Sequence, residues 1–228
     1  MIFLQSLNVT PDSTVQVPVS AENSLSILDL LIKGGWVMMP IAVLFVIAIF
    51  LFFERYIYIS KASKIDNNFL FSIREMLFAG NVKGALDFCK ASNLPIARLL
   101  EKGLSRLGAP IQDIENGIEN MARVEIYNME KNLGLLSAIA SISPMFGFLG
   151  TVTGMIRAFH DISMANDINI SIISGGIYEK MISSATGLIV GILAHFFHTI
   201  LNNMIDRSIN RMEVTAIDFV DLLYKPIK

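Results

Sequence analysis

The chain has 228 residues, of which 53% are hydrophobic and only 17% are charged, where an average soluble domain has about 25% charged residues. The charge is unevenly spread, since residues 34–53, 132–156 and 181–205 contain no Lys, Arg, Asp or Glu. About 20 helical residues cross a bilayer, so these runs predict three membrane spans and exclude a soluble globular protein, a disordered chain and a β-barrel. The net charge of −2 argues against nucleic-acid binding, and a single cysteine, Cys89, which we interpret as a small loop hydrophobe, excludes an internal disulfide.

The N-terminal part of the chain predicts an outer segment and a membrane anchor. Residues 25–31 form a short amphipathic pattern, typical of a helix that lies in the membrane interface. The first span follows, with Trp36 at one end and Arg55 at the other, as is typical of the two membrane interfaces. Its middle is apolar and bulky, so we expect it to face lipid.

The segment between the first two uncharged runs is too long and too periodic to be a linker. We expect a helix that ends near Phe78 before Gly80, a second capped by Asn81 and a third near Pro95. From Pro110 onward, apolar residues recur every three or four positions without a breaker, which predicts one helix that continues into the second span. The predicted segments are 1–33 (outer, with the interfacial helix), 34–55 (span), 56–131 (helical domain), 132–157 (span), 158–178 (loop), 179–205 (span) and 206–228 (tail).

The basic residues set the orientation of the three spans. Fifteen of the 18 lysines and arginines lie in residues 54–131 and 206–228, on one side of the membrane. Basic residues favour the cytoplasmic side. The sequence therefore predicts an N-terminus outside, with the helical domain and the C-terminal tail in the cytoplasm.

The second and third spans are rich in small residues, unlike the first. Small residues spaced by three or four let helices approach closely in lipid, so we expect these two helices to pack together. The third span also carries ionisable residues, with Glu179 near its outer end and His195 and His198 towards the cytoplasm. For the two histidines we expect hydrogen bonds to a neighbouring helix rather than a metal. The glycines assigned to helix packing are Gly147, Gly150, Gly154, Gly187 and Gly191.

Two motifs in these spans resemble the core of the MotA/TolQ/ExbB proton channel family, closest to its ExbB branch. They are Ser143-Pro-Met-Phe-Gly-Phe-Leu-Gly-Thr-Val-Thr-Gly154 and, some twenty residues on, Ile177-Tyr-Glu-Lys-Met-Ile-Ser-Ser-Ala-Thr-Gly-Leu188. The resemblance implies an all-α membrane protein of the bacterial inner membrane, with a periplasmic N-terminus, long cytoplasmic helical extensions and assembly as a pentameric ring. It also implies an ExbD-like single-span partner that carries a membrane Asp, a TonB-like protein, and proton flow that drives mechanical work without a cofactor.

The resemblance also assigns pore-lining positions. Thr151 matches the pore threonine of the second span, Ser184 falls on that of the third with Thr186 close by, and Glu179 matches an acidic residue near the outer end. The chain departs from the family at Leu193, where a proline is frequent, and at His198-Thr199, where Tyr-Asn is frequent.

The chemistry of a proton relay requires a group that titrates, and hydroxyls do not titrate near neutral pH. This chain has no mid-span carboxylate, so the acid must come from a partner. Three alternatives stay open: a TolQ-like subunit for envelope integrity, a non-conducting scaffold, and an intramembrane hydrolase with Ser184 as nucleophile and His195 as base. The hydrolase is disfavoured, because eleven helical residues separate the two side chains by about 16 Å along the axis.

Overall fold

Apolar runs, glycines and prolines divide the chain into long and short helices. The computed structural model describes residues 35–62, 67–164 and 170–224, and these ranges contain helices and turns but no β-strand. The interfacial helix predicted in residues 1–33 lies outside the described residues. The helices are α2 (Met38–Ala62), α3 (Asn67–Phe78), α4 (Val82–Ala91), α5 (Pro95–Leu104), α6 (Ile111–Glu130), α7 (Leu133–Met164) and α8 (Ile170–Tyr224).

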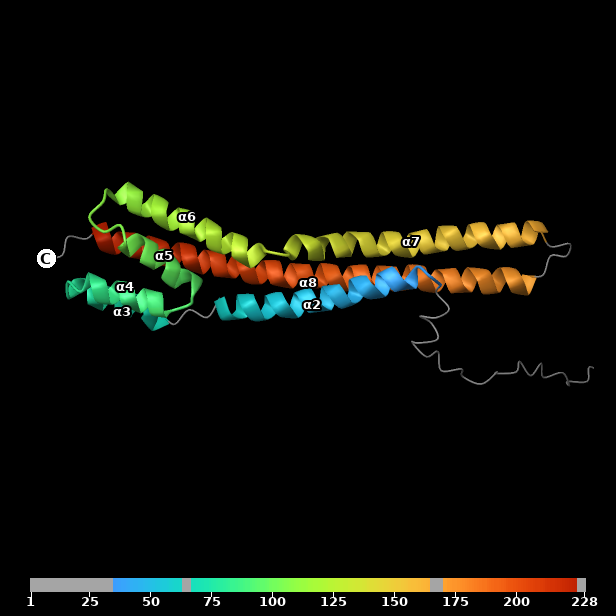
Figure 1. The fold of residues 1–228 in the computed structure, drawn as a ribbon, viewed down its shortest axis with the longest axis horizontal. Coiled ribbons are helices and arrows are strands. Elements are labelled where there is room, and N and C mark those ends of the chain that lie inside the picture. The colour runs from blue at the N-terminus through green and yellow to red at the C-terminus, as the bar shows by residue number, and fades with distance from the viewer. Residues whose placement is uncertain (1–34, 63–66, 165–169, 225–228) are drawn as a thin grey trace, which may run out of the picture.

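Helix α8 is the axis of an elongated molecule (Figure 1). It has 55 residues, and α7 runs antiparallel beside one half of it. We call the end of the molecule where α7 ends and α8 begins the hairpin end. Helices α3, α4, α5 and α6 gather around the other half of α8, at what we call the domain end. Helix α2 lies against α8 and α7 between the two ends.

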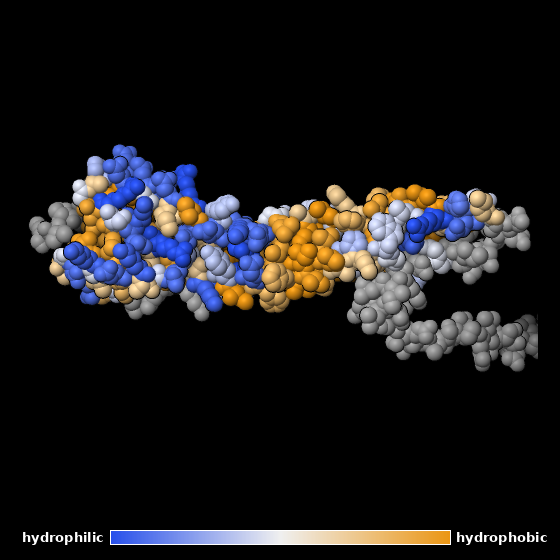
Figure 2. All heavy atoms as spheres, in the orientation of Figure 1, coloured by the Kyte–Doolittle hydropathy of each residue, from blue (hydrophilic) through white to orange (hydrophobic). Residues whose placement is uncertain are grey.

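Three helical stretches are long and apolar enough to cross a membrane: Met38–Ala62, Ile111–Met164 and Ser174–Leu223. The second and third uncharged runs of the sequence lie within them, and the first overlaps Met38–Ala62 from Met38 onward. On the face shown in Figure 2, hydrophobic residues form a band across the middle of the molecule, whereas hydrophilic residues cover most of the domain end. The prediction of an all-α chain with three long apolar helices is therefore confirmed over the described residues.

The end of α3 and the starts of α4 and α5 lie where the sequence predicts. Gly80 adopts a left-handed φ of 72° after α3, a conformation that costs glycine little. Asn81 caps α4, its Oδ1 accepting a hydrogen bond from the Gly84 amide at 2.9 Å. Pro95 opens α5 at a position where no backbone N–H is needed. Cys89, which we expected in a loop, instead lies buried within α4.

The predicted single helix from Pro110 into the second span is wrong. Helix α6 ends at Glu130, and Lys131 and Asn132 separate it from α7. Lys131 has φ −51° and ψ 132°, and Asn132 has φ 68°, the backbone pattern of a type II turn. Asparagine tolerates this left-handed conformation, so the apolar stripe continues while the helix does not.

Arg55 stabilises the end of α6. It lies on α2 with only 7% of its surface exposed, rather than facing the membrane interface as its sequence position suggested. Its Nη1 donates to the backbone carbonyl of Asn128 at 3.2 Å, and its Nη2 pairs with Glu54 at 2.9 Å. The last carbonyls of a helix lack intrahelical donors, so this hydrogen bond satisfies one of them.

The long helices extend beyond the predicted segments. Helix α2 continues to Ala62, α7 continues to Met164, and α8 runs without interruption from Ile170 to Tyr224, within the predicted tail. Most of the predicted loop 158–178 is therefore helical, and its residues 165–169 lie outside the described residues.

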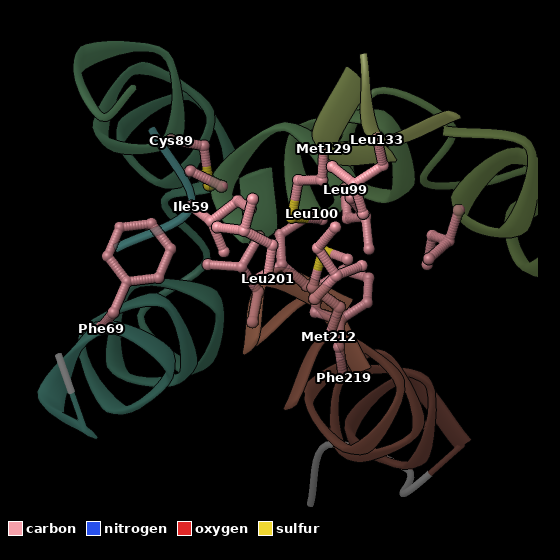
Figure 3. Packing of buried hydrophobic residues seen from close by; sticks show 14 of the residues in the cluster. Ile59, Phe69, Cys89, Leu99, Leu100, Met129, Leu133, Leu201, Met212 and Phe219 are labelled. Atoms are coloured by element: carbon pink, nitrogen blue, oxygen red, sulfur yellow. The ribbon is translucent and has the colours of Figure 1, made fainter. Parts of the chain in front are cut away.

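A hydrophobic core fixes α8 to the helices of the domain end. Phe219 and Leu201 of α8 belong to one buried cluster with Leu100 of α5, Met129 of α6 and Ile59 of α2, all with 0% exposure (Figure 3). Complete burial of such a side chain contributes about 1.5–3 kcal/mol. The core holds the domain end to the same helix that enters the hairpin.

Candidate functional site at the contact of α7 and α8

Helices α7 and α8 touch backbone to backbone. A Cβ atom on Gly187 would lie 2.7 Å from the carbonyl oxygen of Ser143. A Cβ on Gly147 would lie 3.1 Å from the carbonyl oxygens of Ser183 and Ser184. Glycine is the residue that fits these two positions, because any side chain would push the helices apart.

The other glycines assigned to packing lie at the same contact. A Cβ on Gly150 would lie 2.7 Å from Ser183 Oγ, and one on Gly191 would lie 2.6 Å from the ring of Pro144. Gly154 lies against the aliphatic part of the Lys180 side chain. All five glycines thus form one seam along the hairpin.

The structure brings Thr151 and Ser184 to the same level of the hairpin. Gly150 lies opposite Ser183, so the next residue of each helix, Thr151 and Ser184, follows at that level. Both side chains are half-buried. The Thr151 hydroxyl donates to the Phe148 carbonyl at 2.7 Å, and the Ser184 hydroxyl has no hydrogen-bond partner among the described residues.

Thr186 is separated from this pair. It lies two residues after Ser184, which places it about 160° away around the helix. Val190 and Phe197 share its side of α8 and contact α2, where Phe197 stacks on Phe52 with ring centroids 4.3 Å apart. The Thr186 hydroxyl donates to the Ile182 carbonyl at 2.8 Å. Glu179 lies on the first turns of α8, and its side chain is outside the described part of the chain.

A cavity of about 410 Å³ lies beside the seam, on the side of the seam towards the domain end. Sequence reasoning missed it, although two spacings could have indicated it. Ser137, Pro144 and Thr151 are each seven residues apart, which is nearly two turns, and eleven residues, about three turns, separate Ser184 from His195. The cavity is lined by Ser137, Ala140, Ser141, Pro144, Gly191, Ile192 and His195.

The two histidines do not make the predicted hydrogen bonds to a neighbouring helix. His195 is exposed and His198 is half-buried, and neither imidazole has a hydrogen-bond partner within the described ranges. Among those residues no group of three or more His, Cys, Asp or Glu could hold a metal ion. Helix α8 is unbroken between Ser184 and His195, so the two side chains stay about three turns apart, too far for a nucleophile and its base within one chain.

Cys89 is not a candidate nucleophile. Its thiol is buried in the core beside α5, and burial, with a smaller contribution from the Glu101 carboxylate, raises its pKa from 9.0 to about 11. The thiolate is the reactive form, and at neutral pH this thiol is protonated.

Comparison with known proteins places these helices in a family. The model of the MotA/TolQ/ExbB proton channel family matches residues 91–214, which hold α5, α6, α7 and most of α8. The chain is 28% identical to the ExbB-like 3 protein of Synechocystis sp. over 77% of its own length and 84% of that protein. It is 32% identical to the Tol-Pal system protein TolQ of Haemophilus influenzae over 42% of this chain and 41% of TolQ. It is 31% identical to the biopolymer transport protein ExbB of Salmonella typhimurium over 40% of this chain and 35% of ExbB. With a family match over more than half of its length and three helices able to span a membrane, the chain is a membrane protein that belongs to the MotA/TolQ/ExbB proton channel family.

Proposed function

We propose that this chain is the ring-forming subunit of a proton-driven motor in the bacterial inner membrane. In this proposal its N-terminus is periplasmic, its domain end is cytoplasmic, and five copies surround an ExbD-like single-span partner. The observation that carries the proposal is the pair Thr151 and Ser184, which lie level with each other on a glycine-packed hairpin whose membrane-embedded residues are uncharged.

The chemistry of the pair explains why a partner is needed. A hydroxyl donates and accepts hydrogen bonds but does not store a proton near neutral pH. Residues 132–156 and 181–205 contain no carboxylate, so the acid that meets the two hydroxyls is the membrane Asp of the partner. Thr151 and Ser184 would hydrogen-bond this Asp in one protonation state and release it in the other, while Glu179 would raise the availability of protons at the periplasmic mouth.

The membrane potential supplies the work. Each proton that crosses gains about 2.3 kcal/mol per 100 mV, so several protons per cycle deliver a sizeable mechanical step. Neutralisation of the partner Asp would free it from the polar site and let the inner helices move relative to the ring.

We further propose that the work energises TonB-dependent transport across the outer membrane. The match to the ExbB-like protein of Synechocystis extends over 77% of the chain, whereas the match to TolQ extends over 42%. A TolQ-like role in envelope integrity is the second candidate, because the TolQ match has 32% identity and the Salmonella ExbB match has 31%. Expression of this chain with its partner in strains that lack ExbB or TolQ separates the two roles: restored TonB-dependent uptake supports the first, and restored detergent resistance supports the second.

The proton path is tested by proton influx into liposomes that contain the chain with its partner. Thr151→Ala combined with Ser184→Ala should leave the complex intact on gel filtration and abolish influx driven by a membrane potential. Thr153→Ala is the matched control, since its hydroxyl bonds to the Leu149 carbonyl at 2.8 Å and points about 160° away from Thr151 around α7. Influx at the wild-type rate in the double variant would show that the two hydroxyls have no role in the proton path. Absence of influx in the wild-type complex would favour the alternative of a non-conducting scaffold.

A further inference from the structure

The cavity beside the glycine seam is mostly apolar but contains polar groups, although it lies within uncharged segments of α7 and α8. Ser137 and Ser141 of α7 and His195 of α8 line it. The Ser141 hydroxyl donates to the Ser137 carbonyl at 3.2 Å, and the His195 imidazole has no partner among the described residues. An imidazole at this depth of an apolar helix is costly and points to a function.

Pro144 adds a free acceptor to the cavity wall. Proline has no N–H, so the carbonyl of Ala140, four residues earlier in the helix, loses its backbone donor. Ala140 lines the cavity, and a Cβ on Gly191 would lie only 2.9 Å from this carbonyl oxygen, so glycine keeps the carbonyl uncovered. This open cavity of about 410 Å³ has room for water, and its hydroxyls, its imidazole and the free carbonyl are polar groups that can bind it.

The cavity continues the line of Thr151 and Ser184 towards the domain end. On α7, Pro144 and Ser137 follow Thr151 at intervals of seven residues; on α8, Gly191 and His195 follow Ser184 by seven and eleven residues. Both intervals return nearly to the same face of a helix. The hydroxyl pair and the cavity therefore open on the same side of the hairpin, about 10 Å apart along its axis.

We propose that this cavity is the cytoplasmic half of the proton path and that His195 relays the proton through it. The inference rests on the proposed function, because it takes the proton from the partner carboxyl group. The proton leaves the carboxyl oxygen, whose electron pair stays behind as a carboxylate, passes along a chain of water molecules and reaches the unprotonated ring nitrogen of His195. The imidazolium then gives up the proton on its other nitrogen to water, and the neutral ring returns by rotation or tautomer exchange.

The groups around His195 suit this role. Its neighbours in the cavity offer hydroxyls and a carbonyl, and no Lys, Arg, Asp or Glu lines the cavity. Between His195 and the domain end, the next titratable groups of α8 are His198, one turn away, and Asp206, about three turns away. The Asn202 side chain donates a hydrogen bond from Nδ2 to Oδ2 of Asp206 at 3.4 Å. His195 is thus midway between Ser184 and the first carboxylate on the cytoplasmic side, and histidine is the side chain that exchanges protons near neutral pH.

The experiment measures proton influx in liposomes that hold the complete complex with its partner. His195→Gln keeps a polar side chain that cannot titrate and should slow influx by about tenfold or more. His198→Gln is the matched control on the same helix, outside the cavity lining, and should stay within about twofold of wild type. His195→Ala should be equally slow, and imidazole added to the buffer should restore its influx by filling the vacated space.

The outcomes separate this inference from the proposed function. Wild-type influx in His195→Gln, together with no influx in the Thr151→Ala, Ser184→Ala double variant, would overturn the role of His195 and leave the proposed function standing. Influx that is absent from the wild-type complex would overturn both. If the His195 variants fail to assemble, Ser141→Leu keeps the imidazole and fills the cavity, and wild-type influx in that variant would also overturn the inference.

Discussion

Gly187 shows how a single hydrogen atom in place of a side chain sets the distance between two membrane helices. The carbonyl oxygen of Ser143 lies only 2.7 Å from the position that a Cβ on Gly187 would take. Backbone atoms cannot rotate away as the end of a flexible side chain can, so a larger residue must move a whole helix. In lipid, where close packing drives helix association, that displacement also loses contacts on both sides.

Gly187→Ala should therefore destabilise the protein by about 1–3 kcal/mol. The matched control is Gly134→Ala, because no heavy atom lies within 4 Å of its Cβ position and alanine favours a helix. We expect a lower melting temperature in detergent for the first variant and an unchanged or higher one for the second. Equal melting temperatures for the Gly187 variant and wild type would mean that the helices are less tightly joined than the structure indicates.

The site was only partly predictable from single residues. The spacing of small residues predicted the α7–α8 contact, since small side chains three or four apart form a stripe on a helix. The sequence could not separate Ser184 from Thr186, because their faces are defined by α2, which packs on the Thr186 side through Val190. The sequence places His195 within the third uncharged run, but it does not predict the cavity, because the cavity depends on how Pro144 and Gly191 meet across the two helices.

Among the elements, α5 and α6 are joined by one buried ion pair. Arg98 Nη1 lies 2.8 Å from Glu125 Oε1; the Glu125 side chain is 1% exposed and the Arg98 side chain is 38% exposed. Glu125 Oε2 is buried without a hydrogen-bond partner. The negative charge of this buried carboxylate is compensated by Arg98, so loss of Arg98 would leave the charge uncompensated.

Arg98→Ala should cost about 2 kcal/mol of stability, because it leaves the Glu125 carboxylate buried and unpaired. Arg123→Ala is the control, since its pair with Glu119 is exposed, and it should cost no more than about 0.5 kcal/mol. Adding Glu125→Gln to Arg98→Ala should restore part of the loss. Chemical denaturation of the purified protein, followed by circular dichroism, measures all three, and equal losses for Arg98→Ala and Arg123→Ala would contradict the assignment.

The helix starts that have a capping residue or a proline were predictable from the sequence, and the break between α6 and α7, which has neither, was not. Asn81 and Pro95 fixed the starts of α4 and α5 through capping and proline geometry. The break between α6 and α7 has no proline, and its apolar stripe continues across Lys131 and Asn132. The left-handed Asn132 follows a helix end that Arg55 contacts at Asn128, and periodicity does not report tertiary contacts of this kind.

In the whole molecule, the turn at Asn132 is the joint between the domain end and the hairpin. Its φ of 68° costs about 1–2 kcal/mol for most residues with a Cβ and little for glycine. Asn132→Val should therefore lower the melting temperature in detergent, and Asn132→Gly should keep it. If Asn132→Val melted like wild type, the turn would not have a left-handed residue at this position in solution.

The continuity of α8 gives the molecule a lever. Its 55 residues form a rod about 80 Å long that passes unbroken from the hairpin end to the core around Phe219. A tilt of about 5° at one end of α8 would displace its other end by about 7 Å. The turn at Asn132 separates α7 from α6, so α7 can tilt without an equal tilt of α6. A tilt of α8 at the Ser184 level would therefore also move the domain end of the molecule.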